Sequence, residues 1–174
     1  RREKTNFVTV RYGNVVGSTG SVIPVFKQQI EDYEEVRVTN PQMTRFWLSI
    51  DNAIDLVLKA NQFAEDLDGN TFISLCPSMS IGELAQTVWR LVDPDKKRDW
   101  KVKYTGMRPG EKMHEELFSD QEAPRVEGFA RGFVMIPPTD KLTEPRISDG
   151  YNSLKAHRIS VDQMIELIKD AEQV

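Results

Sequence analysis

Hydrophobic residues follow two different spacings along this chain. Residues 6–12 and 71–75 are short, largely apolar runs, which are typical of strands buried in a parallel sheet. After the first run, apolar residues recur four positions apart at Val22, Phe26 and Ile30, which predicts a helix with one buried face. Strand and helix patterns alternate toward the C-terminus, so the sequence predicts an α/β protein.

The same rules predict the remaining elements. Alternating apolar and polar residues indicate strands at 36–39 and 101–105, and another strand is expected near 133–136. A longer helix is predicted from about residue 49 to 64, and a short helix between residues 107 and 118. The apolar side of the longer helix is expected to comprise Ala53, Ile54, Val57, Leu58 and Ala60.

Serine residues mark the starts of two later helices. Ser80 and Glu83 have the spacing of a capping box, in which each side chain binds a free backbone amide. Ser160 is predicted to cap the last helix of the chain.

A glycine-rich turn joins the first predicted strand to the first helix. Gly13, Gly17 and Gly20 let the backbone turn tightly, and Ser21 follows at the expected N-cap position. Such a turn favours anions, because free amides and the helix dipole point toward it. Glycine-rich connections are also found as plain turns, so the spacing alone leaves both interpretations open.

Composition narrows the class of protein. With 174 residues and 39% hydrophobic content, the chain can bury a core. A net charge of −4 argues against a nucleic-acid-binding surface. No apolar run has the length of a membrane span, so we expect no membrane partner and a cytoplasmic location. The one cysteine, Cys76, is expected to be a buried, inert thiol.

Four motifs occur together in one order. They are Arg-Tyr-Gly-Asn-Val at 11–15, Gly-Ser-x-Gly-Ser-Val-Ile-Pro at 17–24, Met-Thr-Arg-Phe-Trp at 43–47 and Gly-Met-Arg-Pro-Gly-Glu-Lys at 106–112. With these motifs the chain resembles the C-terminal half of a UDP-N-acetylglucosamine 4,6-dehydratase of the inverting type. Those enzymes are extended short-chain dehydrogenase/reductases of polysaccharide and pseudaminic acid biosynthesis.

This resemblance implies how the chain is organised. Residues 1–20 and 45–77 would complete a Rossmann-type parallel sheet. Residues 21–44 and 78–174 would form a smaller α+β lobe that binds the nucleotide sugar. The dinucleotide motif and the catalytic Tyr-x-x-x-Lys pair would lie upstream, so we expect the chain to lack both and to be inactive alone.

The resemblance also implies an activity for the full-length enzyme. It would bind NADP, mainly through the upstream half, and assemble as a homo-oligomer. It would oxidise C4 of UDP-N-acetylglucosamine, eliminate water across C5 and C6, and return the hydride to C6. An epimerase or a retaining dehydratase of the same superfamily is an alternative, and so is a non-catalytic binding or oligomerisation fragment.

Arg45 and Arg108 are candidate ligands for the two phosphates. Guanidinium offers paired donors that match phosphate oxygens, and the resemblance places both arginines in the nucleotide site. Arg108 precedes Pro109 and Gly110, which would present it from a rigid corner. Glu111 could then accept hydrogen bonds from ribose hydroxyls. Alternatively, Arg45 forms a structural ion pair and Glu111 only stabilises a helix start.

The remaining candidates follow from the resemblance. Asn14, Ser21 and Val22 are expected to contact the substrate, although asparagine at a strand end is also a common turn former. Tyr12 and Gly13 are expected to contact the cofactor. We predict no catalytic residue and no metal site in this chain, because its two histidines lack metal-ligand spacing.

Overall fold

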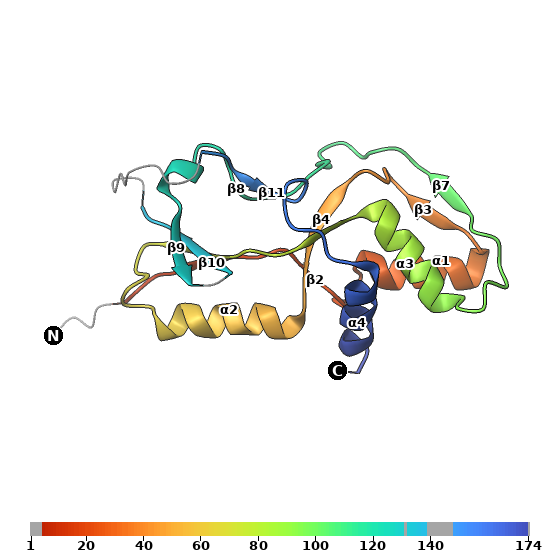
Figure 1. Cartoon of the computed structure of the whole chain (residues 1–174), viewed down its shortest axis with the longest axis horizontal. Helices are drawn as coiled ribbons and strands as arrows, with labels where there is room; N and C mark the ends of the chain where they lie inside the picture. The colour runs from red at the N-terminus through yellow and green to blue at the C-terminus, as the bar shows by residue number, and fades with distance from the viewer. Residues whose placement is uncertain (1–4, 131, 139–147, 174) are drawn as a thin grey trace.

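The computed structural model in Figure 1 describes residues 5–130, 132–138 and 148–173. The helices are α1 (Val22–Tyr33), α2 (Ile50–Gln62), α3 (Ile81–Val92), η1 (Ala123–Arg125) and α4 (Val161–Ala171). The strands are β1 (Thr9–Arg11), β2 (Asn14–Val15), β3 (Val36–Val38), β4 (Thr44–Leu48), β5 (Thr71–Ser74), β6 (Ser78–Ser80), β7 (Val102–Tyr104), β8 (Glu116–Phe118), β9 (Glu127–Ala130), β10 (Phe133–Ile136) and β11 (Tyr151–Asn152). Among the described residues the fold is α/β with mixed sheets, as predicted.

A four-stranded sheet forms one end of the molecule. Its order is β1-β5-β10-β9, with β1 parallel to β5 and the other pairs antiparallel. The two predicted strands are thus neighbours, with Val10 opposite Phe72. Only the second is buried, with Phe72 and Ile73 fully enclosed; β1 lies at the edge of the sheet, none of its residues is buried, and Phe7 before it is 73% exposed. α2 runs along this sheet and contacts β1 and β5 (Figure 1).

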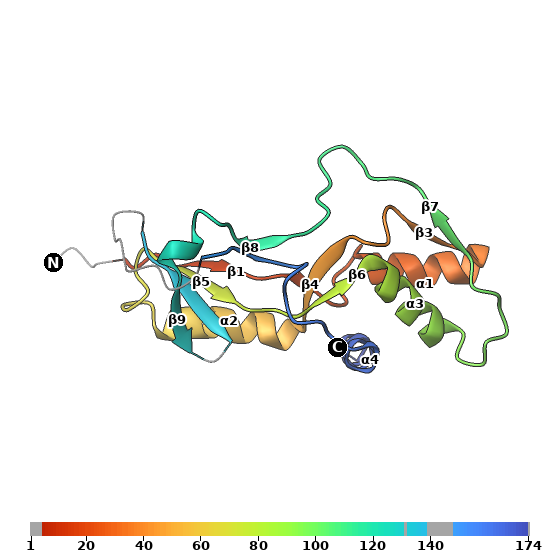
Figure 2. The ribbon, with the colours of Figure 1, turned by 45° about the horizontal axis from the view of Figure 1, so that its top comes forward.

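Three helices and a two-stranded sheet form the other end. α3 packs against α1 and α4, while β3 and β7 pair in parallel beside them (Figures 1 and 2). Ile30, Val36, Leu84, Val88 and Met164 are fully buried in the core that these elements share. The predicted strands at 36–39 and 101–105 are therefore confirmed as partners.

Short strands join the two ends. β4 lies between β2 and β6, and β8 pairs with β11. The ring of Tyr151 stacks between Phe46 and Phe118, with centroid distances of 5.5 and 5.9 Å. This aromatic stack ties β11 to β4 and β8, so a segment close to the C-terminus fixes the centre of the molecule.

The predicted serine caps are confirmed at α3 and α4, where Ser80 and Ser160 each form a complete capping box. Ser49 also caps α2, since its side chain accepts a hydrogen bond from the amide of Asn52. Ser21 holds the N-cap position of α1 but makes no side-chain cap bond. The side chain of Ser21 therefore leaves the first amides of α1 without a cap.

Two local predictions are wrong. No helix forms between residues 107 and 118; the segment is extended and ends in β8, because its backbone pairs with β11 and bridges to Thr44. On α2, the buried residues are Ala53, Leu56 and Ala60. Ile54, Val57 and Leu58 were predicted to be buried, but they are 48%, 49% and 61% exposed. They lie outside the stripe that faces β1 and β5.

The last helix packs against the first turn. Gly17 has φ +83°, and a Cβ there would lie 2.7 Å from the Cβ of Ala171 in α4. Lys27 of α1 and Glu172 form an ion pair beside this contact. Glycine at position 17 is therefore required both by the backbone conformation and by the close approach of α4.

The division into two domains remains a proposal. β9 and β10 fall in the range 78–174 that was assigned to the sugar-binding lobe, yet they extend the sheet of β1 and β5. In the described part of the chain, no helix is long and apolar enough to cross a membrane.

Candidate functional site

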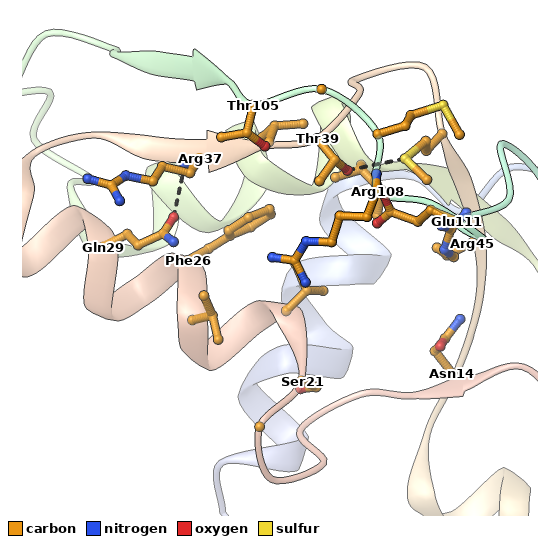
Figure 3. Close-up of a pocket in the computed structure, with 18 of the residues that line it drawn as sticks. Asn14, Ser21, Phe26, Gln29, Arg37, Thr39, Arg45, Thr105, Arg108 and Glu111 are labelled. Atoms are coloured by element: carbon orange, nitrogen blue, oxygen red, sulfur yellow. Dashed lines mark hydrogen bonds between the residues drawn. The ribbon is translucent and has the colours of Figure 1, made fainter.

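A cavity of about 880 Å³ lies between α1, the end of β3 and the loop around residues 105–111 (Figure 3). Its volume is within the range typical of small-molecule sites. The six residues predicted to bind substrate all line it: Asn14, Ser21, Val22, Arg45, Arg108 and Glu111. The fold thus brings together residues that are almost 100 positions apart in sequence.

Arg108 enters the cavity from the loop that follows β7. Its side chain reaches toward α1 (Figure 3), and none of the ion pairs between described residues uses it. The carboxylate of Glu111 accepts a hydrogen bond from the backbone amide of Arg108 at 2.9 Å, and the Glu111 amide donates one to the Arg108 carbonyl at 3.1 Å. Gly110, at φ +82°, permits this turn. The expected rigid corner is present without a helix after it.

Arg45 is held by the protein on two sides. Its Nε lies 3.4 Å from Glu115, and its Nη1 donates to the carbonyls of Thr44 at 2.8 Å and Met113 at 3.3 Å. The side chain is only 16% exposed. The structural ion pair considered from the sequence is therefore real. The hydrogen bonds and ion pairs among described residues use Nε and Nη1 and leave Nη2 for a ligand.

The N-terminus of α1 opens on the same cavity. Ser21 and Val22 line it, and the buried Oγ of Ser21 finds no hydrogen-bond partner among the described residues. The first amides of a 12-residue helix carry a partial positive charge and lack acceptors within the helix. Two guanidinium groups and a helix N-terminus therefore meet around one space, an arrangement suited to an anion.

Asn14 has a fixed orientation. Its Nδ2 donates to the carbonyl of Phe46 at 3.0 Å and to the carboxylate of Glu115 at 2.9 Å. Asn14 is the first residue of β2, which pairs with β4. The amide nitrogen is therefore committed to the protein, and Oδ1 is the atom of this side chain suited to a ligand.

Tyr12 and Gly13 line a separate, smaller cavity of about 300 Å³ that shares Asn14 with the larger one. A Cβ at Gly13 would lie 2.3 Å from the Cβ of Phe46, so the glycine is needed for packing against β4. Tyr12 is exposed. The two residues expected to contact the cofactor therefore lie outside the cavity that the candidate substrate-binding residues line.

Sequence reasoning missed Glu115. It lies in the segment for which a helix was predicted, but the segment is not helical, and the Glu115 carboxylate contacts both Asn14 and Arg45. It also missed polar residues on the far wall of the cavity, namely Gln29, Arg37, Thr39 and Thr105. No sequence signal identified these, because they belong to elements whose meeting depends on the tertiary fold.

The expectation that the chain has no Tyr-x-x-x-Lys spacing is also wrong. Tyr151 and Lys155 have it, but Tyr151 lies in β11 and Lys155 pairs with Asp149. The Tyr151 hydroxyl donates to the carbonyl of Cys76 at 3.2 Å. Burial raises the pKa of the Tyr151 phenol, and its ring stacks between two phenylalanines, so this tyrosine is a structural residue.

Cys76 is buried, as predicted, and burial raises the pKa of its thiol. A raised pKa keeps the thiol protonated near neutral pH, so it is a poor nucleophile. Within the described ranges, no cluster of three or more histidine, cysteine, aspartate or glutamate side chains could hold a metal ion.

The chain resembles known proteins of sugar metabolism. It is 35% identical to a UDP-N-acetylglucosamine 4,6-dehydratase (inverting) of Campylobacter jejuni, over 87% of this chain and 42% of that protein. It is 31% identical to a UDP-glucose 4-epimerase of Rickettsia bellii, over 99% of this chain and 52% of the epimerase. The crystal structure of Pen from Bacillus thuringiensis superposes with a TM-score of 0.84 and 31% identity, over 97% of this chain and 51% of that one.

The chain therefore spans about half the length of these relatives. A family profile described as "Polysaccharide biosynthesis protein" matches residues 1–137, which is most of the sequence. This chain belongs to the polysaccharide biosynthesis protein family.

Proposed function

We propose that this chain is the nucleotide-sugar-binding portion of a UDP-N-acetylglucosamine 4,6-dehydratase. The observation that carries the proposal is the convergence of Arg45, Arg108 and the α1 N-terminus on one cavity of about 880 Å³. A diphosphate carries negative charge along its whole length, and these groups offer donors from two sides. Both arginines would hold it, and the helix amides would neutralise its remaining charge.

The rest of the cavity suits a nucleoside. Phe26 and Val38 give it an apolar wall, and Gln29, Thr39 and Thr105 supply polar groups beyond the arginines. Glu111 uses Oε2 to close its turn, so Oε1 would accept the ribose hydroxyls. Asn14 and Tyr12 lie on the opposite side, toward the smaller cavity, where the sugar would meet the cofactor.

In this proposal the chain positions the sugar and does not itself carry out the reaction. Hydride transfer tolerates little misplacement, so a rigid grip on the diphosphate contributes to the rate. NADP would supply the hydride acceptor in the full-length enzyme. Tyr12 and Gly13 would contact it from the smaller cavity, beside Asn14.

A UDP-sugar 4-epimerase is the second candidate function. The relative from Rickettsia bellii with that name aligns with 99% of this chain. Both activities need the same diphosphate grip, so the grip does not distinguish them. The products do, because the dehydratase forms a 4-keto-6-deoxy sugar and the epimerase inverts C4.

Binding of UDP tests the proposal. Titration calorimetry of this chain with UDP, UDP-N-acetylglucosamine and free N-acetylglucosamine should show binding of both nucleotides and none of the free sugar. Equal responses to all three, or no response to either nucleotide, would remove the nucleotide-sugar assignment. Product analysis of a full-length enzyme that carries this chain, supplied with UDP-N-acetylglucosamine, then separates dehydratase from epimerase.

A further inference from the structure

Glu115 contacts two of the candidate ligand-binding residues at once. Its Oε2 accepts hydrogen bonds from Nδ2 of Asn14 at 2.9 Å and from the amide of Phe46 at 3.3 Å, while Oε1 lies 3.4 Å from Nε of Arg45. These three partners come from the end of β2 and from β4. One carboxylate thus joins the two strands that carry Asn14 and Arg45 into the site.

The backbone of Glu115 is held by Ser153. The Ser153 hydroxyl accepts a hydrogen bond from the amide of Glu115 at 2.9 Å and donates one to the carbonyl of Thr44 at 2.9 Å. Ser153 is fully buried and also lies 2.7 Å from the Thr44 hydroxyl, which in turn contacts Nδ1 of His114 at 2.8 Å. Ser153 therefore fixes the backbone of Glu115 next to β4.

We propose that Glu115 is a positioning residue that orients Arg45 and Asn14 for the diphosphate and sugar. The carboxylate holds Nε and the carbonyls of Thr44 and Met113 hold Nη1, so the guanidinium has one orientation, with Nη2 left for the ligand. The inference rests on the proposed function for the identity of the ligand. Its structural part concerns the free protein and can be tested without any ligand.

A positioning role and a purely electrostatic role of Glu115 predict opposite changes in anion binding. Removing a negative charge beside an anion site should strengthen anion binding if Glu115 acts only through its charge. If Glu115 positions Arg45, Glu115→Gln should instead weaken UDP binding about tenfold, the change that corresponds to losing one modest contact. Binding of uridine, which has no phosphate, should be unchanged. Glu116→Gln, which removes the same charge from the exposed neighbouring residue, is the matched control.

The first measurement is made without ligand. In ¹⁵N-edited NMR of the free chain, the Arg45 Nε–H and the Asn14 carboxamide should exchange slowly with water, and Glu115→Gln should accelerate the Arg45 exchange. Glu116→Gln should leave both signals unchanged. Glu115→Asp retains the charge but retracts the carboxylate, so it should give an intermediate result, and it replaces the glutamine variant if that variant does not fold.

The outcomes separate the two proposals. Unchanged Arg45 exchange in the Glu115 variants would overturn the positioning role, whatever the chain binds. Tighter UDP binding by Glu115→Gln, or an equal loss for UDP and uridine, would overturn it as well. If the parent shows the exchange pattern but does not bind UDP, the positioning of Arg45 stands and the nucleotide-sugar assignment fails.

Discussion

The carboxylate of Glu111 accepts a hydrogen bond from the backbone amide of Arg108 at 2.9 Å, and this bond closes the Arg-Pro-Gly-Glu turn. The bond involves the backbone of Arg108 and not its side chain, and the guanidinium points into the cavity (Figure 3). The two arginines of the site therefore have different surroundings. Arg108 is exposed at the start of a turn, whereas Arg45 is surrounded by protein acceptors.

Replacing Arg108 should affect binding and not stability. Arg108→Ala removes a charge-assisted contact worth about 1.5–3 kcal/mol, which corresponds to roughly tenfold to 150-fold weaker UDP binding. Arg108→Lys should restore only part of the affinity, since it lacks the planar fork. Titration calorimetry and thermal melting measure the two effects. Arg90→Ala, at an exposed position of α3, controls for loss of charge. A large drop in Tm with unchanged affinity would show that Arg108 is structural.

Replacing Arg45 should lower both quantities. Arg45→Met keeps the length of the side chain but removes the guanidinium contacts to Glu115 and to the carbonyls of Thr44 and Met113. Loss of such hydrogen bonds costs about 1–3 kcal/mol of folding free energy. Urea denaturation gives the stability change, and UDP titration gives the affinity. Stability equal to that of the parent would contradict the contacts described for Arg45.

The ion pair of Arg11 and Glu122 should make stability depend on acid pH. Arg11 donates to both carboxylate oxygens at 2.8 and 3.0 Å, and this hydrogen bonding holds the pKa of Glu122 below its ordinary value. A glutamate in the unfolded chain has a pKa of about 4.3. The stabilisation is therefore complete above that pH and is lost as pH falls through the lower pKa of the folded state.

Arg11→Met should remove this contribution. Urea denaturation of parent and variant between neutral and acid pH should show a difference in unfolding free energy that narrows at the acid end. A difference that stays constant across the whole range would contradict a role for the Glu122 carboxylate.

The exposed apolar face of α2 should drive self-association. Ile50, Ile54, Val57 and Leu58 form an apolar stripe on α2, and each is 41–61% exposed. Ile54→Glu with Leu58→Lys places an i,i+4 ion pair on this stripe and should shift the chain toward monomer, as measured by light scattering after size exclusion. Asn61→Glu with Gln62→Lys adds the same charges at exposed polar positions and should not. A parent that is already monomeric and soluble at high concentration would overturn this prediction.

The chain alone should not convert UDP-N-acetylglucosamine. Its Tyr-x-x-x-Lys spacing belongs to Tyr151, whose hydroxyl is bound to the Cys76 carbonyl, and to Lys155, which pairs with Asp149. Incubation with UDP-N-acetylglucosamine and NADP, followed by mass spectrometry, should show no 4-keto-6-deoxy product. Formation of that product would show that this chain carries a catalytic group of its own.

Local signals in the sequence predicted most elements. The helix starts at Ser80 and Ser160 could be predicted because a cap involves residues only three positions apart in the sequence. The structure shows a capping box at both. The prediction of a helix between residues 107 and 118 was wrong because the end of this segment, β8, pairs with β11, which lies more than 30 residues later in the sequence. Exposure of Ile54 and Leu58 could not be foreseen either, since periodicity shows that a face is apolar but not what covers it.

The site shows the same division. Motif resemblance brought Asn14, Ser21, Arg45 and Arg108 to attention, and all of them line one cavity. Glu115 was missed because its importance lies in its distances to Asn14 and Arg45, and no spacing rule encodes these.

The packing of Ala171 against Gly17 has a consequence for the order in which the chain folds. The turn that leads into α1 and the helix that supports it lie at opposite ends of this sequence. Contacts between such distant segments form late, because closing a long loop costs chain entropy. The N-terminus of α1 should therefore reach its final position only after α4 has docked, and a chain truncated before α4 should not bind UDP.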